Sequence, residues 1–96
     1  MPDSSTGDRN ILSFKAGEQI ISEGTQATQA FLIRSGRVKI YYTSGGKVHE
    51  VAQLGAGQIF GEMALISGHH HSANVDAVEN VTVVPISEKI INQKLE

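Results

Sequence analysis

The sequence predicts a mainly β fold with short helices (α+β), an antiparallel β-roll of the double-stranded β-helix or jelly-roll type. Glycines and polar turns recur roughly every eight to twelve residues, between short segments rich in Val, Ile, Tyr and Phe. Only 5% of the residues are aromatic and 10 are glycine, which suits a turn-rich β fold better than a helix bundle. The 96 residues are enough for one hydrophobic core, so we expect a single module.

The predicted strands are short and end at glycine-containing or polar turns. In the fourth strand Val38, Ile40 and Tyr42 alternate with more polar neighbours, which predicts that these three side chains face the core. Pro85 cannot donate to a sheet, so we expect it at an edge or at a strand end. The predicted strands span residues 11–15, 18–22, 29–34, 37–43, 47–54, 58–60, 72–78 and 81–86.

Two helices complete the predicted fold. Residues 62–66 suit one to two helical turns, stopped by Ser67-Gly68. Ser87 is suited to cap a last helix over residues 88–95. We therefore expect a flexible N-terminal tail over 1–10, a β-roll over 11–86 and a C-terminal helical segment over 87–96.

Composition excludes several classes of function. Eight Lys and Arg stand against 10 Asp and Glu with no basic cluster, so we expect no nucleic-acid binding by the chain itself. The absence of cysteine excludes disulfides, thiolate zinc sites and thiol nucleophiles, and fits a cytoplasmic protein. Apolar runs are too short to span a bilayer, and the polar N-terminus lacks a signal segment. We expect no membrane contact by the chain itself.

The stretch from Phe60 to Val75 carries the main functional signal. An acidic residue begins a short helix there, and a helix start offers unpaired backbone N–H groups and a partial positive charge. Gly61, directly before the helix, lets a ligand approach the main chain closely. This pattern predicts a site for a small anion.

The order and spacing of several fragments resemble the cyclic nucleotide-binding domain family, the β-roll found in catabolite activator protein, kinase regulatory subunits and nucleotide-gated channels. The likeness runs from about Phe14 to Ile86. The fragments are Ala16-Gly17-Glu18, Glu23-Gly24, Phe31-Leu32-Ile33 with Ser35-Gly36, Leu54 followed by Gly57 and Phe60-Gly61-Glu62, and Met63-Ala64-Leu65-Ile66.

The resemblance implies three roles in the loop that begins at Gly61-Glu62, the family's phosphate-binding cassette. It implies that the Glu62 carboxylate accepts from a ribose 2′-hydroxyl, and that backbone N–H groups near Ala64 and Leu65 hold the cyclic phosphate. The family's phosphate-pairing arginine falls on His71, after His70 where proline is frequent. The candidate ligand-binding residues are Gly61, Glu62, Met63, Ala64, Leu65, His71, Ser72 and Ala73.

Histidine in place of arginine predicts weaker phosphate binding. Imidazole is shorter, offers one donor in a given direction and is mostly neutral near pH 7, whereas guanidinium offers a charged fork. Losing one charge-assisted hydrogen bond of about 1.5–3 kcal/mol lowers affinity by about one to two powers of ten. The family's later helices also close over the purine. This sequence ends at Glu96 within the first of them, so we expect the lid helix to be absent and to come from a longer chain or a partner.

The expected function is that of a non-catalytic regulatory sensor that binds a cyclic nucleotide, cyclic AMP by default and cyclic GMP as the other choice. It would act on an output domain or a homodimer partner. The alternative is a ligand-free member of the fold that serves as a regulatory or oligomerisation module. A metal site at the three histidines is not expected. Metal-binding β-rolls of the cupin type have two alternate histidines followed closely by a glutamate, but past His69 and His71 the next glutamate is the distant Glu79. No cofactor is expected. The sequence offers no convincing nucleophile with a paired base, so we do not expect an enzyme.

Overall fold

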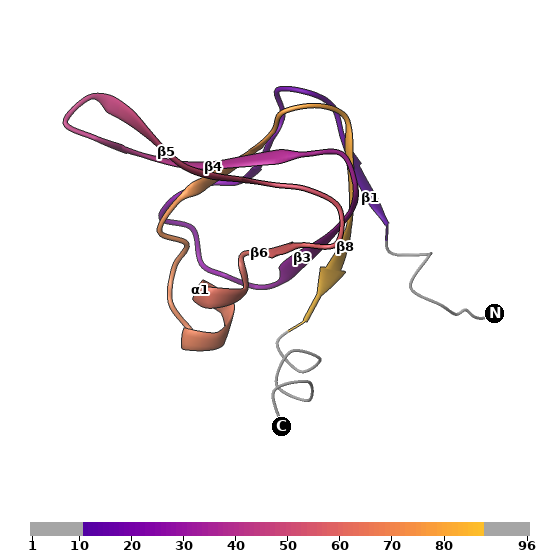
Figure 1. Ribbon diagram of the computed structural model, residues 1–96. Coiled ribbons are helices and arrows are strands. Elements are labelled where there is room, and N and C mark those ends of the chain that lie inside the picture. Colours follow the sequence, from indigo (N-terminus) through magenta and orange to yellow (C-terminus); the bar gives the residue numbers. More distant parts are fainter. Residues whose placement is uncertain (1–10, 88–96) are drawn as a thin grey trace.

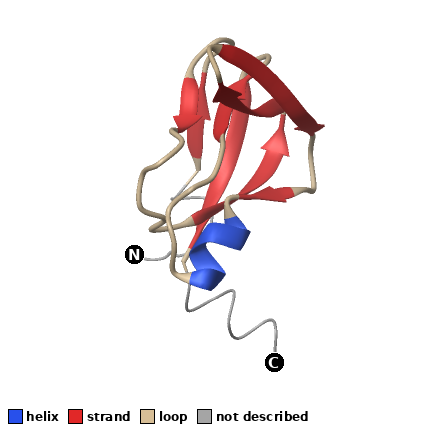
Figure 2. Cartoon of the chain, turned by 90° about the vertical axis from the view of Figure 1, so that its left-hand side faces the viewer, coloured by secondary structure: helices blue, strands red, loops and turns tan. Residues whose placement is uncertain are grey.

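Two antiparallel sheets enclose the hydrophobic core. The computed structural model describes residues 11–87. Its elements are β1 (Leu12–Phe14), β2 (Gln19–Ile21), β3 (Ala30–Ser35), β4 (Val38–Ser44), β5 (Lys47–Leu54), β6 (Ile59–Phe60), α1 (Glu62–Ser67), β7 (Asn74–Ala77) and β8 (Val81–Ile86). The sheets have the orders β1-β8-β3-β6 and β2-β7-β4-β5, and their faces pack together while α1 lies at one end (Figures 1 and 2). The predicted mainly β roll is confirmed.

The strands form where alternating apolar side chains reach the space between the sheets. Val38 on β4, Phe60 on β6 and Val83 on β8 are almost fully buried. The rings of Phe31 and Phe60 stack with centroids 5.3 Å apart, which joins β3 to β6. Burial of this kind is the main favourable term in folding. The core cluster comprises Ile21, Phe31, Ile33, Val38, Phe60, Val75, Ala77, Val81 and Val83.

The predicted alternation in the fourth strand is wrong beyond Ile40. Val38 is buried and Ile40 half-buried, but the register with β5 shifts between Ile40 and Tyr41. An extra residue at such a bulge reverses the faces of the residues that follow. Tyr42 is therefore exposed and stacks on His49, with ring centroids 4.9 Å apart, whereas Tyr41 is half-buried.

The hairpin of β4 and β5 projects from the body of the molecule (Figure 1). β7 pairs with β4 only as far as Tyr41, so the outer part of the hairpin has two strands alone. In the other sheet, Pro85 is the penultimate residue of β8 and pairs with Phe31, beyond the end of the pairing with β1. It lies at a strand end, as predicted.

The expected tail over 1–10 and the expected helix over 88–95 lie outside the described residues and remain predictions. Within residues 11–87, no helix has the length and apolar character needed to cross a membrane.

Candidate functional site

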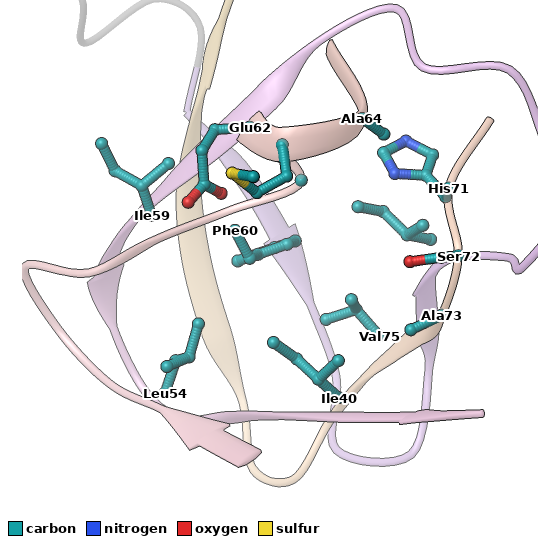
Figure 3. Close-up of a pocket in the computed structure, with 13 residues that line it drawn as sticks. Ile40, Leu54, Ile59, Phe60, Glu62, Ala64, His71, Ser72, Ala73 and Val75 are labelled. Atoms are coloured by element: carbon teal, nitrogen blue, oxygen red, sulfur yellow. The ribbon is translucent and has the colours of Figure 1, made fainter. Parts of the chain in front are cut away.

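A pocket of about 360 Å³ opens between the two sheets, beside α1 (Figure 3). Its walls come from both sheets, from the start of α1 and from the loop that leads into β7. The volume falls in the range of small-molecule sites, roughly 300–1,000 Å³. We call it the cassette pocket, and its lining residues are Ile21, Ile40, Leu54, Ile59, Phe60, Gly61, Glu62, Met63, Ala64, His71, Ser72, Ala73 and Val75.

Gly61 lets α1 begin directly against the strands. Its φ of 83° lies in the left-handed region, which a residue with a Cβ adopts only at a cost. A Cβ at this position would come within 3.1 Å of Ile21 Cδ1 and 3.4 Å of His71 Cε1. The missing side chain therefore brings the helix start close to both residues.

The first turn of α1 leaves main-chain donors available. The Leu65 N–H donates to the Gly61 carbonyl at 3.4 Å. The N–H groups of Glu62, Met63 and Ala64 precede that bond and have no acceptor within the helix. Leu65 N–H is already in use, so of the Ala64 and Leu65 pair expected from the resemblance only the Ala64 N–H belongs to this set of donors.

The predicted ligand residues line one pocket, with a single exception. The half-buried Glu62 carboxylate points into the pocket from one side, while His71 and the Ser72 hydroxyl lie across from it (Figure 3). Leu65 is the exception, because its side chain is buried against Ala30 in a separate small cluster. Its role is to fasten α1 to β3, and its side chain does not line the pocket.

His71 is held by its main chain. Its N–H donates to the Thr25 carbonyl and its carbonyl accepts from the Gly24 N–H, both at 2.8 Å. Burial lowers the pKa of His71 below its ordinary 6.5. The imidazole is therefore mostly neutral at pH 7 in the ligand-free chain.

The apolar part of the pocket could not be identified from the sequence. Ile40 and Leu54 reach it from β4 and β5, and Ile59 and Phe60 from β6. The sequence marks these residues only as strand residues with an apolar side. Which of them meet depends on strand order, and strand order is a long-range property.

A sequence model of the cyclic nucleotide-binding domain matches residues 11–96. The chain belongs to the cyclic nucleotide-binding domain family. It is 35% identical over 75 residues to the cAMP-dependent protein kinase regulatory subunit of Candida albicans, covering 78% of this chain and 16% of that protein. It is 32% identical over 74 residues to the Cyclic AMP receptor protein of Thermus thermophilus, covering 76% of this chain and 34% of that protein.

Solved structures place the fold in the same family. The EAL enzyme Bd1971, in cAMP-bound and cGMP-bound forms, is similar with a TM-score of 0.84 and 34% identity over 88% of this chain and 23% of that chain. The chain thus spans a minor part of the length of the proteins it matches.

The lining of the cassette pocket includes seven of the eight candidate ligand residues, and its charged side chain is the acidic Glu62. No Lys or Arg is among the lining residues. Among the residues that the structure describes, no three His, Asp or Glu side chains converge as metal ligands would.

Proposed function

We propose that this chain is a non-catalytic regulatory sensor that binds a cyclic nucleotide in the cassette pocket, cyclic AMP by default and cyclic GMP as the other choice. One observation carries the proposal. One pocket brings together an inward-facing carboxylate, the main-chain N–H groups of the first turn of α1, an imidazole and a hydroxyl, from Glu62 to Ser72. Proteins of similar sequence are named for cyclic AMP, and a similar structure was solved with each of the two nucleotides.

Each part of the pocket suits one part of the ligand. The Glu62 carboxylate would accept from the ribose 2′-hydroxyl. The free N–H groups of Met63 and Ala64, with the Ser72 hydroxyl, would donate to the cyclic phosphate. The apolar side formed by Ile40, Leu54 and Ile59 offers the purine a surface away from water.

His71 makes binding depend on pH. Burial lowers its pKa in the free state, whereas a phosphate beside it would raise that pKa by favouring the charged imidazolium. Binding would then take up a proton. The affinity gained from the ion pair is fully present below the free-state pKa and is lost as pH rises through the bound-state pKa. We expect tighter binding in mildly acidic buffer.

Nucleotide binding would favour one conformation of the chain over another, which requires that the two conformations bind the nucleotide with different affinities. An output domain or a second copy would receive the signal, and the expected C-terminal helix lies outside the described residues. A cytoplasmic location, expected from the absence of cysteine, stays a prediction.

A second candidate function is a ligand-free module that regulates or oligomerises. The observation that favours it is electrostatic. The pocket lining holds a carboxylate and a mostly neutral imidazole but no Lys or Arg. It therefore lacks a permanent positive charge to attract a phosphate.

Calorimetric titration of cyclic AMP and cyclic GMP in mildly acidic and mildly alkaline buffer separates the two candidates. The sensor predicts saturable binding that is tighter in acid, and His71→Arg should tighten it by about one to two powers of ten. His70→Arg is the matched control, because it adds the same charge one residue away, outside the pocket lining. Absence of binding in both the wild-type chain and the His71→Arg variant would leave the ligand-free module. Binding that is flat with pH would remove His71 from the phosphate site.

A further inference from the structure

His71 lines two pockets. One is the cassette pocket, and the other is a pocket of about 280 Å³ on the side of the β2–β3 loop, lined among others by Ser22, Thr25 and Gln29. The His71 ring lies beside Gly61. The position of the residue as a whole is set by the hydrogen bonds of its main chain.

That main chain is held by the turn at residues 23–25. Gly24 and Thr25 make the two 2.8 Å hydrogen bonds to His71. The turn is closed by Thr25, whose N–H and hydroxyl both donate to the Ser22 carbonyl, at 3.2 Å and 2.6 Å. It is further fixed from outside, because the Glu23 N–H donates to Asn74 Oδ1 at 2.8 Å.

Asn74 thereby links β7 to the turn that holds His71. It begins β7, three residues after His71, and its side chain returns to the turn that holds His71. Gln19 Nε2 also donates to Asn74 Oδ1 at 3.4 Å, so two donors from β2 and the turn converge on one acceptor. An alanine at this position would leave both donors without that partner.

We propose that Asn74 is a positioning residue, which orients His71 and the adjoining residues 72–73 toward the ligand by fixing the turn at 23–25. The placement of His71 does not depend on a ligand. The effect on affinity rests on the proposed cyclic nucleotide function. The chain of contacts runs from Asn74 Oδ1 to Glu23 N–H, along the turn, and from Gly24 and Thr25 to His71.

Asn80 supplies a matched control. Its Oδ1 accepts from the Ala16 N–H at 3.1 Å, so it is also an asparagine that fastens a turn, but at a position that does not line the cassette pocket. Asn74→Ala and Asn80→Ala remove the same kind of bond. Asn74→Asp keeps an acceptor at the original place.

The test is an NMR titration of the His71 ring in the ligand-free full chain, with amide hydrogen exchange and nucleotide calorimetry on the same variants. The ionisable groups that bracket His71 are Glu62 across the pocket, Glu23 in the turn, and His69 and His70 before it in the chain. Their titrations are assigned in the same spectra, so that a change at His71 is separated from theirs.

We expect Asn74→Ala to raise the pKa of His71 toward its ordinary value, to lose exchange protection at Gly24 and His71, and to weaken nucleotide binding about three- to tenfold. Asn74→Asp should restore the protection, and Asn80→Ala should change none of the three. An unchanged His71 titration in Asn74→Ala, or an equal change in Asn80→Ala, would overturn the proposal. If the wild-type chain binds neither nucleotide, the proposed function fails and the ring titration still decides the role of Asn74.

Discussion

Gly61→Ala tests whether the start of α1 packs as tightly as the structure indicates. The substitution places a Cβ on a residue with φ of 83°, at 3.1 Å from Ile21 Cδ1 and 3.4 Å from His71 Cε1. Ile21 is 6% exposed and belongs to the core cluster, and its terminal methyl would have to shift by a few tenths of an ångström to admit the new Cβ. Backbone strain and crowding therefore add at this position.

The strain can be measured separately at Gly57, which has φ of 90° and nothing within 4 Å of an added Cβ. A left-handed alanine costs about 1–2 kcal/mol, and the reduced freedom of the unfolded chain returns about 0.4–1 kcal/mol. Gly57→Ala should thus destabilise by about 1 kcal/mol. Gly61→Ala should cost about 2 kcal/mol, because overpacking adds about 1 kcal/mol more.

Urea and thermal unfolding of both variants measure the difference. For a domain of this size about 1 kcal/mol lowers Tm by roughly 4–8 °C, so Gly61→Ala should melt clearly below Gly57→Ala. It should also weaken nucleotide binding, since the new methyl group lies beside Ile21 and His71 in the lining of the cassette pocket, whereas Gly57→Ala should not. Equal free energies of unfolding for the two variants would show that Ile21 and His71 do not pack against residue 61.

Two further substitutions test the carboxylate and the helix anchor. Glu62→Ala should weaken cyclic AMP binding by about ten- to a hundredfold, the loss of one charge-assisted hydrogen bond. In calorimetry with 2′-deoxy cyclic AMP the same substitution should cause no further loss of affinity, and an undiminished loss would place the carboxylate away from the ribose. Leu65→Ala should destabilise the chain by about 2–4 kcal/mol in urea unfolding, because that side chain is 4% exposed. Ile66→Ala, at 42% exposed, should cost less, and a reversed order would contradict the helix orientation.

Much of the fold followed from local signals. The strand Lys47–Leu54 and the strand Val81–Ile86 have the predicted bounds, and α1 ends one residue after the prediction. These segments combine alternating apolar residues with glycine or polar turns, and both signals act over a few residues. The cassette wall was predictable for a related reason, because residues 61–64 and 71–73 are close in sequence and are joined by one helix and one loop.

The features of the structure that the sequence did not predict depend on contacts between distant segments. The bulge at Ile40 and Tyr41 reflects a register that β4 shares with β5, and nothing within β4 alone announces it. The burial of Leu65 follows from the approach of α1 to β3, and Ala30 lies far from it in sequence. The hydrogen bonds between the turn at 23–25 and His71 join residues more than forty positions apart. Hydrogen bonds of this kind carry no local pattern.

Histidine at residue 71, where the family resemblance implies arginine, can be understood from how this loop is supported. Its conformation depends on main-chain bonds, on the left-handed Gly61 and on the side chains of Leu65 and Asn74, none of which involves the imidazole of His71. A change at residue 71 therefore leaves the pocket standing while it changes the charge that faces a ligand. Fold and ligand chemistry are therefore separable in this pocket. Under the proposed function, the affinity for a cyclic nucleotide would depend on the protonation of the His71 ring, and the acid dependence of binding would measure that protonation directly.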